Sequence, residues 1–238
     1  MRLYKLIFIS VALLTTTLLS GYRIMEQSNP EITQTGLALA INNTTVTYKT
    51  TTLPDLDTFV RSVTNGNADQ VVGVYVPGTL ALPAVQQPKN DPNFVSRDPD
   101  VVTQFDAVSK FDSVGLLAHN YLAGDYFYDL MKSQVVIIVY GNGARSYYKV
   151  SEVQQYQALS PTSPQSDFID LSDPEQRKMS AGELFSRVYT LTNRVIFQTC
   201  ILRNGDPSWG RMFVIATPME EGTALQPATW RERIISLF

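Results

Sequence analysis

Short β-rich segments bounded by turn residues recur between residues 71 and 217, and they limit what this chain can fold into. Residues 71–76 are followed by a Pro-Gly pair, and residues 134–140 are followed by Gly-Asn-Gly. Such runs between turn signals are typical of strands, and a short Gly-containing connection between two of them is typical of a hairpin. No long helical segments alternate with these runs. The pattern therefore predicts a mostly β protein, a closed and mostly antiparallel barrel rather than a sheet of βαβ units.

We predict about seven or eight strands and a few short helices. Two helix starts carry clear signals: Asp98-Pro99 is typical of an N-cap followed by a first-turn proline, and Ser180 with Glu183 is a capping-box pattern. Further strands are expected at residues 79–85, 112–119, 146–159, 194–202 and 211–217, and short helices at residues 55–64, 98–109, 125–131 and 180–189. Residues 160–173 and 203–210 are expected to be loops.

The N-terminal segment has the composition of a membrane-targeting segment. Arg2 and Lys5 precede an uncharged, mostly apolar stretch from residue 6 to residue 22. Since about 20 residues usually span a bilayer, this stretch is at the lower limit for a transmembrane helix. The basic N-terminal side predicts an uncleaved single-pass anchor, with the rest of the chain outside the cytoplasm. A cleaved signal peptide is the alternative.

This interpretation divides the chain into four parts. Residues 1–25 form the anchor, and residues 26–69, which are rich in Thr, Asn and Gln, form an extracytoplasmic spacer. Residues 70–218 form the barrel domain, and residues 219–238 form a C-terminal tail with a short apolar end.

Charge and composition exclude several classes of function. The chain has 19 Lys and Arg against 22 Asp and Glu, a net charge of −3, and no basic run, which disfavours nucleic-acid binding. One Cys and one His exclude a multi-Cys zinc site and a multi-His metal centre, and we expect no cofactor.

Three residues, each at or near the end of a predicted strand, form a possible nucleophilic site. His119 ends one strand, Cys200 lies in or at the end of another, and Arg211 opens the last. A thiol is mostly protonated at neutral pH, and a neighbouring imidazole can take its proton. The thiolate can attack a carbonyl, and a guanidinium can stabilise the oxyanion that forms. If the three side chains converge on one exposed cleft, they suffice for acyl transfer through a thioester.

The sequences around these residues resemble motifs of the sortase family. Residues 115–120, GLLAHN, resemble the strand that ends in the sortase histidine, and residues 198–200, QTC, resemble the end of the TLxTC signature. Residues 209–216, WGRMFVIA, resemble the strand that opens with the sortase arginine, and residues 74–85 resemble the opening segment of sortase domains. The order of His, Cys and Arg also agrees, and the resemblance covers about residues 70–218. It does not assign a subclass.

The chain departs from the sortase pattern at three places. Ile196-Phe197 stands where the signature has Thr-Leu, and Leu117-Ala118 stands where a small residue and Gly usually precede the histidine. A long segment, residues 160–190, lies between His119 and Cys200. By resemblance, it covers the substrate groove and sets the choice of sorting motif. Some sortases bind calcium through acidic loop residues, and the resemblance makes four acidic residues of this segment candidates, although a solvated acidic loop is the preferred interpretation. They are Asp167, Asp170, Asp173 and Glu175.

The resemblance implies a membrane-anchored cysteine transpeptidase. Cys200 would attack the Thr carbonyl of a C-terminal LPxTG-like motif on an exported protein, and an amine from a cell-wall precursor or a pilin lysine would accept the acyl group. His119 would act as general acid and then as base, and Arg211 would hold the oxyanion, with Arg203 as its rival. Substrate contacts are expected from the neighbouring Thr199, Ala118 and Asn120.

Two other functions use the same residues. An exported cysteine hydrolase would use water in place of the amine, and the sequence does not separate it from a transpeptidase. A sortase-like domain without activity would only bind its partners. The presence of Cys, His and Arg together favours an enzyme.

Overall fold

The structure of the protein is a computed structural model that describes residues 53–163 and 165–219. The predicted anchor at residues 1–25, most of the predicted spacer and residues 220–238 of the predicted tail lie outside the described residues. Within the described part of the chain, no helix is long and apolar enough to cross a membrane.

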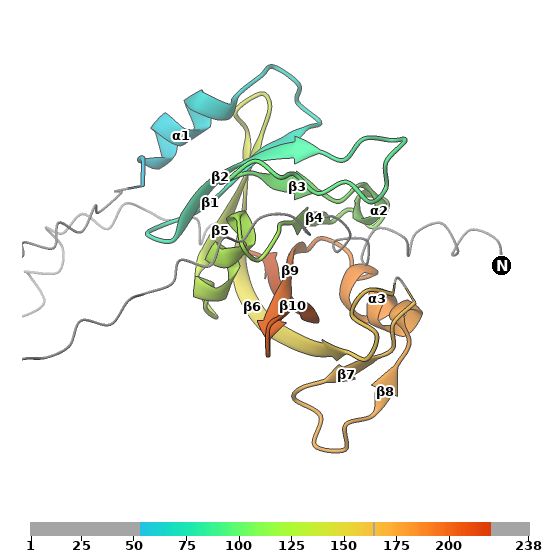
Figure 1. The fold of residues 1–238 in the computed structure, drawn as a ribbon. Coiled ribbons are helices and arrows are strands. Elements are labelled where there is room, and N and C mark those ends of the chain that lie inside the picture. The colour runs from blue at the N-terminus through green and yellow to red at the C-terminus, as the bar shows by residue number, and fades with distance from the viewer. Residues whose placement is uncertain (1–52, 164, 220–238) are drawn as a thin grey trace, which may run out of the picture. The chain divides into compact units, whose positions relative to one another are not determined.

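Eight strands close into a barrel, which confirms the predicted fold class (Figure 1). The strand order around the barrel is β10-β9-β4-β3-β2-β1-β5-β6, and pairing between β10 and β6 closes it. Most pairs are antiparallel, while β2–β3 and β4–β9 are parallel. The barrel strands are β1 (Val71–Val76), β2 (Leu80–Gln86), β3 (Val102–Gln104), β4 (Val114–Leu117), β5 (Val135–Tyr140), β6 (Arg145–Ala158), β9 (Val195–Arg203) and β10 (Asp206–Pro218).

Side chains alternate between the barrel interior and its outer face, as the pleat of a strand requires. On β9, Val195 and Phe197 belong to the interior cluster, to which every barrel strand contributes. The intervening Ile196 belongs to a second cluster on the outer face, together with Phe213 and Ile215 of β10. The strands β4, β9 and β10 therefore carry apolar side chains on both faces, which explains why their sequences read as continuous apolar runs.

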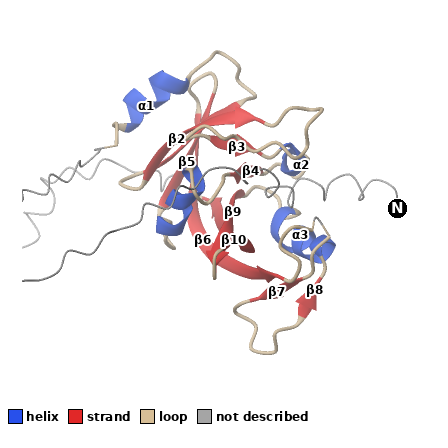
Figure 2. Ribbon diagram, viewed as in Figure 1, coloured by secondary structure: helices blue, strands red, loops and turns tan. Residues whose placement is uncertain are grey.

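Helices cover parts of this outer face (Figure 2). Helix α3 (Ala181–Tyr189) packs Leu184, Phe185 and Val188 into the outer cluster. The capping box between Ser180 and Glu183 is present, as predicted. The short helices α2 (Asp106–Ser109) and η2 (Ala123–Asp129), a 3₁₀ helix, flank β4 in the chain.

Helix α1 (Leu56–Val63) confirms the helix predicted at residues 55–64, with Asp55 as its N-cap. Its buried residues Phe59 and Val60 join a third cluster with Val72 and Tyr75 of β1. The packed structure therefore includes residues ahead of position 70.

Three predictions of local structure are wrong. Residues 98–109 form the strand β3 and the four-residue helix α2, because Val102 pairs with Ala84 and is fully buried in the barrel. The predicted loop at 160–173 contains β7 (Phe168–Asp170), which pairs with β6 and with β8 (Lys178–Met179). The predicted loop at 203–210 is mostly strand, because Asn204 and Gly205 both adopt positive φ and make a tight hairpin turn.

Candidate active site

Three adjacent strands of the barrel position His119, Cys200 and Arg211. On the parallel pair β4–β9, Leu117 lies opposite Gln198, and the Ala118 amide donates to the Gln198 carbonyl at 3.2 Å. Strand β4 ends at Leu117, so His119 follows two residues past the end of the strand that neighbours β9. Cys200 in turn lies opposite Arg211 on β10. The three residues, called the row below, therefore come from the end of β4 and from facing positions on β9 and β10.

The row lies on the outer face of the barrel. Leu117, Ile196 and Phe213 belong to the outer cluster, and residues two or four positions away along the same strand share that face. Cys200 and Arg211 meet this condition and lie side by side, and His119 follows Leu117 by two residues, just past the end of β4.

All three side chains are covered, whereas the sequence predicts an exposed cleft. Cys200 is 4% exposed, His119 is 5% exposed and Arg211 is 1% exposed. The cover is polar in part, because backbone carbonyls of Pro161, Ser208 and Gly210 meet Arg211, and Cys200 belongs to none of the apolar clusters of the described residues. In this structure the three residues are therefore closed off from solvent.

Backbone carbonyls hold the Arg211 guanidinium. Its Nη1 donates to the carbonyls of Ser208 at 2.9 Å and Gly210 at 2.8 Å, and its Nη2 donates to the carbonyl of Pro161 at 3.3 Å. A carbonyl oxygen accepts a hydrogen bond but carries no formal charge, so these three contacts hold the guanidinium without pairing its charge. A fixed positive charge therefore lies beside Cys200, and it ties the loop after β6 to the site.

The imidazole of His119 is buried with one ring nitrogen uncommitted. Its Nδ1 has no hydrogen-bond partner among the described residues. Burial lowers the pKa of His119, the nearby Arg97 charge lowers it further, and a hydrogen bond to the Val95 carbonyl opposes this shift. The ring of Tyr121 lies 5.1 Å from the imidazole, centroid to centroid. The imidazole is therefore neutral at neutral pH and suited to accept a proton.

The lowered pKa of His119 predicts a pH-dependent stability. Just below the ordinary pKa of 6.5, His119 is protonated in the unfolded chain but still neutral in the folded chain, because folding lowers its pKa. The free energy of unfolding should therefore fall as the pH drops below about 6.5 and level off below the folded pKa. Urea unfolding at several pH values, compared between the wild type and His119→Gln, measures this contribution. Equal slopes in the two proteins would contradict it.

The three expected substrate contacts have different positions. Ala118 belongs to the interior cluster, and the Thr199 hydroxyl donates to the Ala118 carbonyl at 3.0 Å. Both side chains therefore lie on the inner face of their strands, opposite to the face of Cys200 and Arg211. The Asn120 amide donates to the Pro207 carbonyl at 3.0 Å and ties the end of β4 to the β9–β10 hairpin.

Arg203, the predicted rival of Arg211, lies away from the row. It occupies the exposed end of β9, and its guanidinium stacks over the Trp209 ring at 4.6 Å from the centroid. Of the two arginines, Arg211 is the one opposite Cys200.

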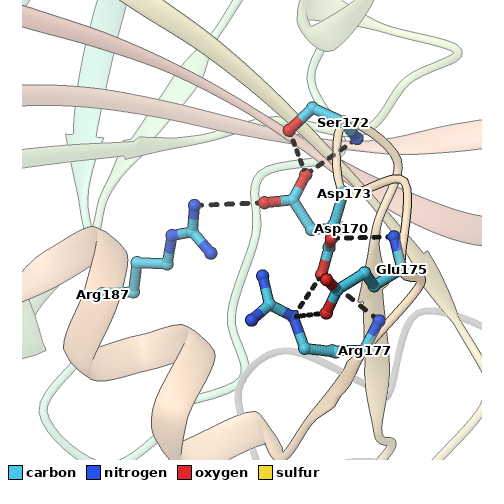
Figure 3. Close-up of polar contacts among 6 residues, drawn as sticks. All are labelled: Asp170, Ser172, Asp173, Glu175, Arg177 and Arg187. Carbon is cyan, nitrogen blue, oxygen red and sulfur yellow. Dashed lines mark hydrogen bonds and ion pairs between the residues drawn. The ribbon is translucent and has the colours of Figure 1, made fainter.

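Three acidic residues of the β7–β8 region, Asp170, Asp173 and Glu175, make ion pairs and turn hydrogen bonds (Figure 3). Asp170 pairs with Arg187 of α3 at 3.1 Å and accepts two hydrogen bonds from Ser172. Asp173 pairs with Arg177 at 2.9 Å. No group of three or more His, Cys, Asp or Glu in the described part of the chain could hold a metal ion. The contacts of Asp170 instead tie the hairpin to α3.

Sequence reasoning missed Tyr128 of η2. Its hydroxyl donates to the Cys200 carbonyl at 2.7 Å, and its ring is 42% exposed. A signal is present in the sequence, because three tyrosines, Tyr121, Tyr126 and Tyr128, follow His119 within a few residues. Their spacing does not reveal which of them returns to Cys200.

The chain was compared with known proteins. No protein-family model matches it, and no curated protein sequence matches it. Solved structures that match include sortase A of Listeria monocytogenes, with 11% identity, a TM-score of 0.38, and coverage of 63% of this chain and 88% of that one. Sortase C-1 of Actinomyces oris matches with 14% identity, a TM-score of 0.41 and coverage of 71% and 82%. Sortase C of Clostridium perfringens matches with 12% identity, a TM-score of 0.39 and coverage of 68% and 81%.

Proposed function

We propose that this protein is a sortase-like cysteine transpeptidase that works through a thioester on Cys200. The observation that carries the proposal is that Cys200 lies opposite Arg211 while His119 follows the end of the neighbouring strand β4. A thiol, a neutral imidazole and a fixed guanidinium are the groups that acyl transfer requires.

The first half-reaction forms the acyl-enzyme. The Cys200 sulfur attacks the Thr carbonyl carbon of an LPxTG-like sorting motif as its proton passes to His119 Nδ1, the uncommitted ring nitrogen. The tetrahedral oxyanion is stabilised by Arg211. The peptide C–N bond then breaks, His119 returns the proton to the leaving amine, and the segment after Thr departs.

The second half-reaction reverses these roles. An acceptor amine, from a cell-wall precursor or a pilin lysine, attacks the thioester while neutral His119 takes its proton. The C–S bond breaks, and a new amide bond joins the exported protein to its acceptor. The Cys200 thiolate that leaves takes the proton from His119. The covered site favours an amine over water, since exclusion of water limits hydrolysis of the acyl-enzyme.

Residues 160–190 fit a role in choosing the sorting motif. This segment contains β7, β8 and α3, and α3 packs on the same outer face that carries the row. The Pro161 carbonyl contacts Arg211 directly. A peptide that reaches Cys200 would therefore displace or contact this segment.

The proposal also includes a place in the cell. Arg2, Lys5 and the apolar stretch that follows support a single-pass membrane anchor with the barrel outside the cytoplasm. Enzyme and exported substrate would then meet at the same membrane surface.

A peptide library tests the proposed reaction. The full chain is incubated with sorting-motif peptides, and intact-mass spectrometry is used to look for an acyl adduct on Cys200 that hydroxylamine removes. With an added amine, the expected product is the amide of the peptide fragment that ends in Thr. Free acid at every amine concentration would favour a hydrolase, and the absence of any adduct or product would favour a binding domain.

A further inference from the structure

The Cys200 carbonyl lies where β9 loses its neighbour β4. Along a strand, the backbone groups of alternate residues point to the same neighbouring strand. The Gln198 carbonyl accepts from the Ala118 amide, so the Cys200 carbonyl points to the same side. Strand β4 ends at Leu117, and the chain then turns into η2. No further sheet bond from β4 reaches Cys200.

The hydroxyl of Tyr128 takes the position of the missing donor. It donates to the Cys200 carbonyl at 2.7 Å. Burial, together with electrostatic interaction with Cys200 and Asp125, raises the pKa of Tyr128, so its hydroxyl keeps its proton and acts as a donor. An unsatisfied carbonyl at this point would loosen the end of β9 that carries the sulfur.

The other end of η2 is fixed to His119. The His119 carbonyl accepts hydrogen bonds from the amides of Leu122 at 3.0 Å and Gly124 at 2.9 Å. At Gly124 a Cβ atom would come within 2.3 Å of the Thr199 hydroxyl and 2.6 Å of the His119 carbonyl oxygen, so only glycine permits this close approach. The helix thus joins the backbone of His119 to the backbone of Cys200.

We infer that Tyr128 is a positioning residue that sets the Cys200 thiol against His119 by donating its hydroxyl to the Cys200 carbonyl. The inference rests on the proposed role of Cys200 as nucleophile. Removing the hydroxyl alone keeps the ring and its packing but releases the carbonyl, so the effect falls on the geometry of the thiol and imidazole. Tyr126, on the same helix, offers a matched control because its hydroxyl bonds to Asp100 instead.

Carbonyl NMR tests the contact directly. The chain has one cysteine, so labelling with ¹³C at the cysteine carbonyl gives a single protein resonance. In the full chain, Tyr128→Phe should move this resonance upfield, as expected when a carbonyl loses a hydrogen bond, and Tyr126→Phe should leave it in place. If Tyr128→Phe does not fold, 3-fluorotyrosine in the wild-type chain, a stronger donor, should move the resonance downfield. An unmoved resonance in the variant, or in the fluorinated chain if the variant does not fold, would overturn the inference.

Thiol reactivity tests the consequence without any substrate. The alkylation rate of Cys200 by iodoacetamide is measured from pH 5 to pH 9 in the wild type, both phenylalanine variants and His119→Gln. Loss of one hydrogen bond predicts about a fivefold slower rate at neutral pH for Tyr128→Phe and a profile closer to that of His119→Gln. A wild-type profile for Tyr128→Phe would refute the positioning role, whether or not the chain proves to be a transpeptidase.

Discussion

Replacing Cys200 with alanine is expected to abolish acyl transfer. The chain has no second thiol that can form the thioester, so product formation should fall by at least about a thousandfold, to the background rate. The measurement is amide product from a sorting-motif peptide and an amine, quantified by mass spectrometry. The acyl adduct on the protein should disappear at the same time.

The fold of this variant should survive. Cys200 is buried but belongs to none of the apolar clusters of the described residues, so alanine removes one sulfur at a cost of about 1 kcal/mol. A thermal unfolding curve separates loss of chemistry from loss of structure. A folded Cys200→Ala protein that still makes the amide would exclude Cys200 as the nucleophile.

The sequence predicts the strands of the barrel well because most of them carry their own signals. β1 and β5 are runs of β-branched residues that end at turn residues, and the capping box of Ser180 marks the start of α3 within one residue. The errors fall where tertiary pairing decides. In β3, three residues become a strand because β2 and β4 lie on either side of them, which the Asp98-Pro99 helix signal does not reveal.

The sequence likewise predicts only part of the candidate site. The motifs single out His119, Cys200 and Arg211, and the register places Cys200 opposite Arg211, with His119 just past the end of the adjacent strand β4. Alternate residues of a strand point to opposite faces of the sheet. Which face Ala118 and Thr199 occupy is therefore known only when the pairing register is known. The cover over the row and the contact from Tyr128 depend on how loops return to the barrel, and no local sequence pattern encodes that return.

Replacing Arg211 with lysine is expected to lower the rate of acyl transfer by about a hundredfold. Lysine keeps the positive charge, but its ammonium cannot reproduce the planar fork that meets three backbone carbonyls. The charge beside Cys200 would then occupy a different position relative to the oxyanion. The measurement is kcat and KM for a sorting-motif peptide, and the loss should fall mainly on kcat, because the oxyanion forms only after binding.

The matched control is Arg203→Lys, which makes the same change at the other candidate arginine. Arg203 is exposed and stacks on Trp209, so its rate should stay within about twofold of the wild type. A large loss in Arg203→Lys with a small loss in Arg211→Lys would reverse the assignment of the oxyanion donor. Because Arg211 is 1% exposed, a destabilised lysine variant is also expected, and its unfolding curve shows whether the lower kcat belongs to folded protein.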